Sequence, residues 1–92
     1  MIRSFASRAT EETFEGRCPA RFRSIQVVAE RKLQILDSAV DLNDLRVPPG
    51  NRLEKLAGDR RGQHSIRIND QWRICFRWTE DGPHDVEIVD YH

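Results

Sequence analysis

Residues 72–79 read Trp-Arg-Ile-Cys-Phe-Arg-Trp-Thr, and this stretch decides the fold class. Every second side chain, from Trp72 to Trp78, is aromatic or aliphatic. Because successive side chains of a β-strand point to opposite faces, the stretch predicts a strand with one apolar face. We expect that face to pack under helices. The opposite face, with Arg73, Cys75 and Arg77, is the expected working surface.

Further strands are predicted on both sides of this stretch. The four expected strands lie at about 52–57, 63–69, 72–79 and 84–91. The segments 58–62, 69–70 and 80–83 contain glycine, asparagine, aspartate and proline, which are typical turn residues. Connections this short join antiparallel neighbours, so the second half of the chain predicts an antiparallel meander.

The first half of the chain carries helix signals instead. Thr10 and the two glutamates after it predict the N-cap and first turn of a short helix that ends at Gly16. Pro19 opens a longer helix that runs to about Ser38. Residues 2–5 alternate in polarity like a short edge strand.

Helical spacing divides the longer helix into an apolar and a polar side. The residues expected in the core are Ile25, Val28, Ala29, Leu33 and Leu36. The residues expected to face outward are Arg31, Lys32 and Gln34. Asp41 is expected to cap one more turn through Leu45, and the breaker at 48–51 separates the helices from the strands. We therefore predict a single α+β domain, residues 1–92, with N-terminal helices packed on a small antiparallel sheet.

Composition argues against several protein classes. No run approaches the roughly 18 apolar residues of a membrane span, and the N-terminus lacks the apolar core of a signal peptide, so we expect a cytoplasmic protein. Cys18 and Cys75 are too few for a disulfide framework and are expected to be free thiols. The three histidines, His64, His84 and His92, lack zinc spacing, so we expect no metal and no cofactor.

Charge is segregated along the chain although the formal net charge is zero. Residues 52–78 carry seven basic and three acidic side chains, whereas residues 79–92 carry five acidic side chains and no lysine or arginine. The seven basic residues are Arg52, Lys55, Arg60, Arg61, Arg67, Arg73 and Arg77. A neutral total argues against a salt-driven nucleic-acid coat. A locally basic segment still predicts a polyanion site, and these residues are the candidates for RNA binding.

Cleavage of RNA is one reaction that the residue types support. Attack of the 2′-hydroxyl on its own phosphate needs a base, an acid and cations at the phosphate, but no metal. Arg67, Arg73 and Arg77 can supply the cations if they converge on one face. Tyr91 can stack on a base or donate a proton, and the imidazole of His92 suits proton transfer at neutral pH.

The same residues also have plainer interpretations. The strand arginines could form a solvated face with ion pairs to Glu54 or Glu87. Tyr91 could be an amphipathic rim residue and His92 a frayed terminus. Asp90 could orient His92 or act as a base itself.

Most of the chain, and most densely the part from Gly50 onward, resembles the HigB group of bacterial toxins, small ribosome-dependent endoribonucleases of the RelE/ParE superfamily. The residues that match the group's Leu-x-x-Leu-x-Gly-Asp-Arg-x-Gly block are Leu53, Leu56, Gly58, Asp59, Arg60 and Gly62. Residues 70–73, Asp-Gln-Trp-Arg, stand for its Asn-x-Trp-Arg strand motif. Residues 90–92 read Asp-Tyr-His, as the toxins of this group end.

The resemblance implies a RelE-like fold and a toxin of a type II toxin–antitoxin system that cleaves mRNA in the ribosomal A site. It places a phosphate-contacting arginine at Arg73 and the catalytic or substrate-contacting group at Asp90, Tyr91 and His92. The implied partners are a HigA-like helix-turn-helix antitoxin and the 70S ribosome with its mRNA. Operator DNA would be contacted only through the antitoxin.

One departure leaves the mechanism open. Members of the group carry a catalytic histidine and, three places later, a lysine, where this chain has Glu54 and Ala57. Glu54 could serve as the base, whereas a strand places the adjacent Lys55 on the opposite face. Weaker cleavage, or a target in rRNA or ribosome biogenesis, are the alternatives.

Two further alternatives come from other functional classes. ParE toxins share the fold and inhibit DNA gyrase without enzymatic activity, but they lack the terminal Tyr-His pair that this chain has. A plain RNA-binding module comes last.

Overall fold

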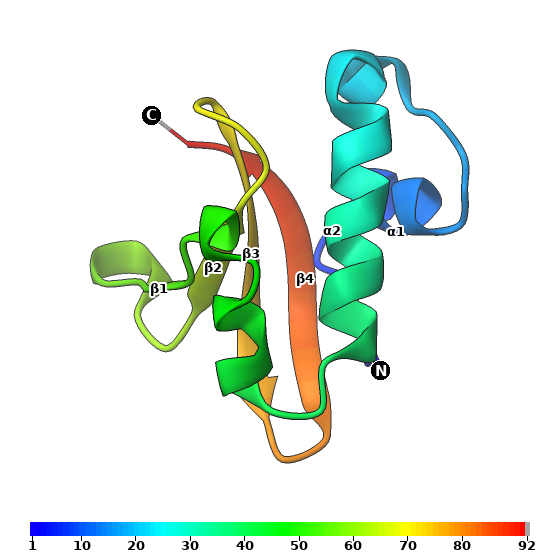
Figure 1. The fold of residues 1–92 in the computed structure, drawn as a ribbon. Helices are drawn as coiled ribbons and strands as arrows, with labels where there is room; N and C mark the ends of the chain where they lie inside the picture. Colours follow the sequence, from blue (N-terminus) through cyan, green and yellow to red (C-terminus); the bar gives the residue numbers. More distant parts are fainter. Residues whose placement is uncertain (92) are drawn as a thin grey trace.

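In the computed structural model, which describes residues 1–91, the alternating stretch forms strand β3, Trp72–Thr79. The other strands are β1, Glu54–Lys55, β2, His64–Arg67, and β4, Gly82–Asp90. They form one sheet in the order β1-β2-β3-β4, with every neighbouring pair antiparallel (Figure 1). The expected meander is therefore confirmed.

Strand β1 is shorter than the strand expected at 52–57. Arg52 has a left-handed backbone with φ 46°, and Gly58 has φ 63°, so the chain leaves extended geometry on both sides of β1. Between them, the amide of Leu56 donates to the carbonyl of Gln63 at 2.9 Å and ties this segment to β2. The 3₁₀ turn η4, Gly58–Arg60, then projects from the edge of the sheet (Figure 1).

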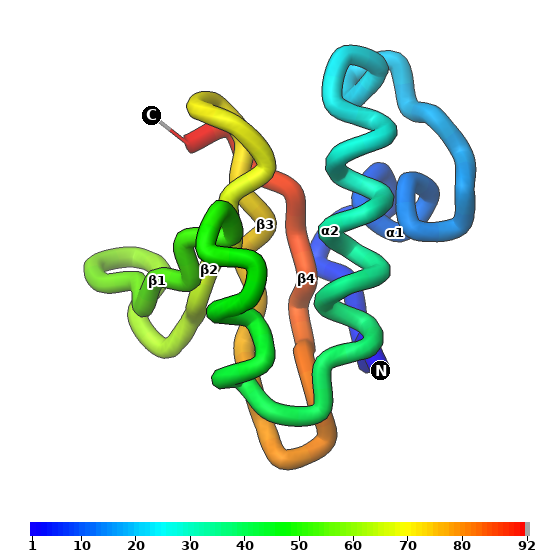
Figure 2. Tube along the Cα trace, viewed as in Figure 1, coloured from blue at the N-terminus to red at the C-terminus, as the bar shows by residue number. Residues whose placement is uncertain are grey.

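Two helices lie on the same side of the sheet, as predicted. α2, Gln26–Ser38, runs along the sheet beside β4, and α1, Arg8–Phe14, packs against α2 (Figures 1 and 2). The longer helix ends at Ser38 as expected, but its first part is the 3₁₀ helix η1, Ala20–Ile25.

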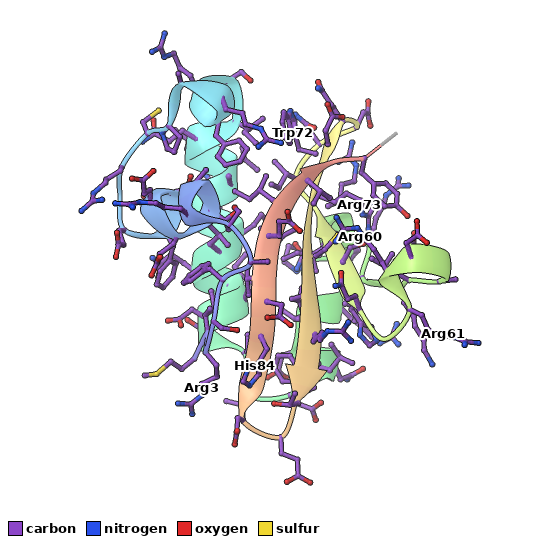
Figure 3. The ribbon with its side chains drawn as sticks, turned by 180° about the vertical axis from the view of Figure 1, so that it is seen from behind. Arg3, Arg60, Arg61, Trp72, Arg73 and His84 are labelled. Carbon is purple, nitrogen blue, oxygen red and sulfur yellow. The ribbon has the colours of Figure 1, made fainter. Side chains whose placement is uncertain are left out.

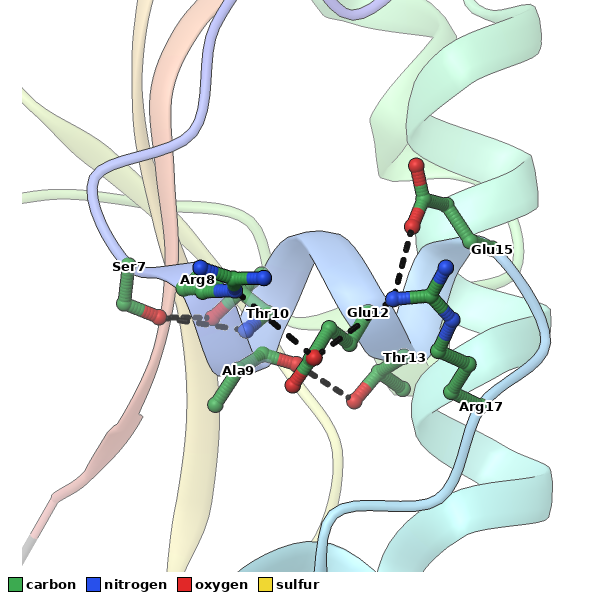
Figure 4. A network of polar contacts seen from close by, with 8 residues as sticks. All are labelled: Ser7, Arg8, Ala9, Thr10, Glu12, Thr13, Glu15 and Arg17. Carbon is green, nitrogen blue, oxygen red and sulfur yellow. Dashed lines mark hydrogen bonds and ion pairs between the residues drawn. The ribbon is translucent and has the colours of Figure 1, made fainter.

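Helix α1 begins before the residue expected to cap it. Its N-cap is Ser7, whose Oγ accepts a hydrogen bond from the amide of Thr10 at 3.1 Å (Figure 4). Thr10 is instead buried inside the helix, where its Oγ1 accepts from the amide of Ile88 on β4 at 2.9 Å. The prediction that Thr10 caps the helix is therefore wrong, because its hydroxyl instead accepts a main-chain hydrogen bond from β4.

The core lies between the helices and the apolar face of β3. Trp72, Ile74 and Phe76 are buried there, and Trp78 is partly buried against the same cluster. The rings of Trp72 and Phe22 meet edge to face, with their centroids 5.5 Å apart. This edge-to-face contact is a favoured aromatic geometry. The apolar face predicted from the alternation is confirmed.

Two expectations for the longer helix are wrong. Val28 is 37% exposed, because the buried stripe of α2 runs from Ala29 through Leu33 and leaves Val28 at its margin. Lys32 does not face outward. It is half-buried beside this stripe, and its Nζ donates a hydrogen bond to Oδ1 of Asn51.

The remaining segments connect these layers. Residues 2–5 lie along β4 but form only one parallel bridge, Phe5 with Val86, rather than a regular strand. The expected turn after Asp41 is the capped 3₁₀ helix η2, Leu42–Arg46. A shorter one, η3, Pro49–Asn51, leads into β1. Within residues 1–91, none of the helices has the length and apolar character needed to cross a membrane.

Candidate functional site

The face of the sheet turned away from the helices, called here the arginine face, carries the candidate site. Cross-strand register places Arg73 on β3 opposite Arg67 on β2, and both lie on this face. Figure 3 shows Trp72 on the side of the helices, with Arg73 and Arg60 on the other side of the strands. The working surface expected from the alternation of β3 is thus a separate face from the core.

Arg73 is held by two neutral oxygen atoms. Its Nε donates to the hydroxyl of Ser65 at 2.8 Å, and its Nη2 donates to the main-chain carbonyl of Arg52 at 2.8 Å. Among the ion pairs of residues 1–91, none involves Arg73. Because neutral acceptors orient the guanidinium without cancelling its charge, Arg73 can still attract a phosphate.

Tyr91 lies beside this guanidinium. The Cζ of Arg73 is 5.5 Å from the centroid of the Tyr91 ring, a cation–π distance. The amide of Tyr91 donates to the carbonyl of Gln71 at 2.6 Å, which fixes the backbone just beyond β4. The side chain is 38% exposed, so one part of the ring remains open for stacking on a nucleobase.

The structure does not bring Asp90 onto the same face. Asp90 pairs with Trp72 in the β3–β4 register, so its side chain starts from the helix-facing side of the sheet. There its Oδ2 accepts a hydrogen bond from Nε2 of Gln71 at 3.2 Å. His92, the remaining member of the predicted Asp-Tyr-His group, lies outside the described residues.

Glu54 lies on the arginine face and Lys55 on the opposite face, as strand geometry predicts. Glu54 is the cross-strand partner of Ser65, and Lys55 is the partner of His64. The ring of His64 stacks on Phe76 in the core, with ring centroids 6.2 Å apart. Burial and the nearby Lys55 lower the pKa of His64, so its imidazole is neutral at physiological pH.

The other candidate RNA-binding arginines differ in how they are held. Arg60 pairs with Glu87 at 3.5 Å, Arg67 pairs with Asp70, and Arg77 pairs with Asp85 at 3.4 Å. All three pairs are accessible to solvent, and surface pairs contribute about 0–1 kcal/mol, so a phosphate can compete for these cations.

Arg77 lies on the same face as Arg67 and Arg73, because side chains alternate without interruption along β3 from Arg73 through Cys75 to Arg77. An irregularity in register after Cys75 places three steps of β4 against two of β3, so that Arg77 stands opposite His84. The three strand arginines therefore share one face, with Arg77 farther along β3. Arg61 is exposed on the η4 side of the sheet, away from the helices (Figure 3).

Cys75 forms the floor of the arginine face. It is fully buried with Leu56 and Val89 in a small apolar cluster. Burial raises the pKa of its thiol, which removes it as a nucleophile near neutral pH. Within residues 1–91, no group of histidine, cysteine, aspartate and glutamate side chains could hold a metal ion.

Ser65 and the Arg52 carbonyl are site groups that the sequence analysis missed. Ser65 is buried and lies 8 residues from Arg73, and Arg52 lies 21 residues from it. A serine in a strand carries no distinctive signal, and the use of a carbonyl depends on backbone geometry. Only the register between β2 and β3 could have indicated Ser65.

Comparison with known protein families shows which of the families with this fold the chain belongs to. A family model described as the RelE-like toxin of the type II toxin–antitoxin system HigB matches residues 10–92. The chain belongs to the HigB-like toxin family. The match includes β1 to β4 and therefore the whole arginine face of this HigB-like toxin.

Individual proteins with similar sequences carry the same family name. Toxin HigB-1 of Vibrio cholerae is 51% identical over 57 residues, which are 62% of this chain and 60% of that protein. Endoribonuclease HigB of Proteus vulgaris is 30% identical over an alignment of 96 positions that covers both chains completely. A chain in the YoeB–YefM complex from Staphylococcus aureus superposes with a TM-score of 0.62 and 20% identity, covering 100% of this chain and 98% of that one. This structural similarity confirms the RelE-like fold.

Proposed function

We propose that this HigB-like toxin is a metal-independent endoribonuclease, a single toxin domain over residues 1–92 that cleaves mRNA in the ribosomal A site and inhibits translation and growth. The observation that carries the proposal is Arg73, a guanidinium oriented by neutral acceptors beside the exposed ring of Tyr91. A cation next to a stacking platform is what RNA phosphate and base recognition require. The name of the Proteus vulgaris relative, Endoribonuclease HigB, supports the same activity.

The chemistry assigns a role to each group. Arg73 stabilises the negative charge that redistributes on the phosphate during attack by the 2′-hydroxyl. Tyr91 stacks on the adjacent base, and His92 transfers the proton to or from the reacting oxygens. Glu54, exposed on the same face, takes the role of the base. Asp90 acts indirectly, by orienting the last two residues.

The remaining basic side chains contact RNA around this centre, with Lys55 reaching it from β1 at the edge of the sheet. They are Arg52, Lys55, Arg60, Arg61, Arg67 and Arg77. In the proposal the ribosome positions the mRNA, which allows a chain with zero net charge to act on a polyanion.

Cleavage positions test the proposal directly. Induced expression should arrest growth, and new 5′ ends should accumulate inside translated codons when total RNA is sequenced from its 5′ ends. The same RNA without ribosomes should be cut far more slowly, because substrate positioning is lost. Comparable cleavage of naked RNA would contradict the dependence on ribosomes. New ends in rRNA alone would support the rRNA target instead.

Glu54 provides a second test. Glu54→Gln removes the proton acceptor but keeps the size of the side chain, so the cleavage rate should fall by about 10²–10⁴-fold if Glu54 is the base. Stability should change little, because Glu54 is exposed. Glu80→Gln, an exposed turn residue remote from β1, is the matched control. Unchanged single-turnover cleavage by the Glu54 variant would assign the base to another group.

The second part of the proposal concerns the antitoxin, a HigA-like helix-turn-helix protein that binds the helical side and leaves the arginine face open. The segment between positions 17 and 32 carries five basic residues as an electrostatic contact for an acidic partner: Arg17, Arg21, Arg23, Arg31 and Lys32. The structure narrows this set. Arg17 pairs with Glu12 and Glu15, and Lys32 is used internally by Asn51. Arg31 lines an open groove between α2 and η2.

Charge reversal at the exposed Arg23 and Arg31 should therefore slow association with the antitoxin. We expect a decrease of about tenfold or more at low salt that shrinks as ionic strength rises, measured as the association rate by surface plasmon resonance. The control reverses Arg60 and Arg61, which lie on the other side of the sheet from α2 (Figure 3). Equal association rates for the two double variants would place the antitoxin elsewhere.

A further inference from the structure

The backbone before β1 is built around a buried asparagine. Asn51 is fully buried, and its amide group donates to the carbonyls of Leu45 at 3.2 Å and Val47 at 3.3 Å. Its Oδ1 accepts from the ammonium group of Lys32 on α2. All three polar positions of this amide are therefore satisfied, which fixes the turn relative to the helix.

The residue that follows has an unusual backbone conformation. Arg52 has φ 46° and ψ 56°, the left-handed region that bulky side chains seldom adopt. Its amide donates to the carbonyl of Pro49 at 3.1 Å. The hydrogen bond from the Arg52 amide and the hydrogen bonds of Asn51 fix the backbone on this side. The carbonyl of Arg52 then points toward β3, where it accepts a hydrogen bond from Nη2 of Arg73 at 2.8 Å.

Ser65 holds the other side of the same guanidinium. It lies on β2, opposite Cys75 of β3, and its buried hydroxyl accepts from Nε of Arg73 at 2.8 Å. The two acceptors come from separate segments and bind two different nitrogen atoms. This arrangement restricts rotation of the guanidinium plane and leaves Nη1 and one N–H of Nη2 for a substrate.

We propose that the main-chain carbonyl of Arg52 and the hydroxyl of Ser65 form a clamp that positions Arg73, with Asn51 and Lys32 fixing the clamp to α2. Arg52 then acts through its backbone conformation as well as through the charge that the RNA contacts. The inference rests on the proposed role of Arg73 in cleavage. The residues of the clamp are positioning residues, because they contact Arg73 and not the reacting atoms.

Two substitutions of Arg52 separate the effect of its backbone conformation from the effect of its charge. Arg52→Asn and Arg52→Val both remove the guanidinium, but asparagine tolerates a positive φ and a β-branched side chain does not. The expected difference between the two variants therefore reports the carbonyl alone. In ribosome-dependent assays, kcat should be about 10–100-fold lower for Arg52→Val than for Arg52→Asn, while their KM values stay similar.

Arginine side-chain NMR supplies a readout that needs no catalysis. Exchange of the Arg73 Nε–H with solvent should accelerate by about tenfold in Ser65→Ala, and Ser65→Thr should restore the slow exchange because it keeps the hydroxyl. Arg52→Val should shift the Arg73 signal, and Arg52→Asn should not. The Nε–H groups of Arg3 and Arg46 bind the Asp81 carbonyl and Asn43 Oδ1 at 2.8 and 2.9 Å, and serve as internal controls.

The outcomes distinguish the clamp from the proposed function. Identical Arg73 signals and kcat values for Arg52→Asn and Arg52→Val would overturn the clamp. If Arg52→Val fails to fold, the Ser65 pair decides the same question. If the wild-type protein cleaves no RNA on ribosomes, the proposed function fails, while the NMR comparison still tests the positioning of Arg73.

Discussion

Replacement of Arg73 by alanine should lower the rate of RNA cleavage by about 10²–10³-fold and abolish growth inhibition, as expected when a preorganised charge at the transition state is removed. The guanidinium lies on an open face, has no ion pair within residues 1–91, and is oriented by Ser65 and the Arg52 carbonyl. The fold should persist, since losing these half-buried hydrogen bonds costs about 1–3 kcal/mol. Urea unfolding and single-turnover cleavage measure the two effects separately.

Arg73→Lys distinguishes charge from geometry. Lysine keeps the positive charge but cannot bind Ser65 and the Arg52 carbonyl with a planar fork, so most of the activity should still be lost. Arg3→Ala is the matched control, because Nε of Arg3 also donates to a carbonyl, that of Asp81, at 2.8 Å. Full toxicity of Arg73→Ala would show that the arginine face is only a solvated surface.

The faces of the sheet could be predicted from the sequence because strand alternation is a local property. Trp72, Ile74 and Phe76 became core, and Arg73 fell on the opposite face, without any knowledge of the neighbouring strands. The same rule placed Glu54 and Lys55 on different faces. The type and direction of the strands followed from short turns, which leave antiparallel pairing as the available connection.

Features that depend on distant residues could not be predicted in this way. Lys32 has a partner 19 residues along the chain, and Thr10 has one 78 residues along, so neither helical spacing nor capping preference could indicate their roles. The environment of Arg73 shows the same limit. Its acceptors are a serine on β2 and a backbone carbonyl just before β1, and both depend on how these segments lie relative to β3.

Asp90 shows that residues adjacent in a sequence motif need not lie together in a functional site. The run 90–92 is continuous in sequence, yet the β3–β4 register turns Asp90 toward the helix-facing side while Tyr91 lies beside Arg73. Adjacent residues of an extended chain alternate in direction, so Asp90 and Tyr91 point to different sides of the sheet. An indirect role for Asp90, through the backbone and Gln71, agrees with this geometry.

Removal of Tyr91 and His92 should abolish cleavage while leaving the fold nearly unchanged. Tyr91 is 38% exposed, and the core cluster is complete without it, so stability should fall by about 1 kcal/mol or less. Cleavage should fall by about 10²–10⁴-fold or more, because the stacking ring beside Arg73 and the proposed acid–base imidazole are lost together. Thermal unfolding and antitoxin binding should match the full-length protein.

Single substitutions separate the contributions of Tyr91 and His92 to cleavage. Tyr91→Phe keeps the ring beside Arg73 and removes only the hydroxyl, so it should retain activity if Tyr91 stacks and lose activity if Tyr91 donates a proton. His92→Gln keeps a polar side chain without a titrating imidazole, and we expect about 10²–10⁴-fold slower cleavage and loss of the pH dependence near neutrality. A folded, antitoxin-binding protein that lacks residues 91–92 and remains fully toxic would overturn this site. The reaction would then have to depend on Glu54 and Arg73, the two remaining candidates on the arginine face.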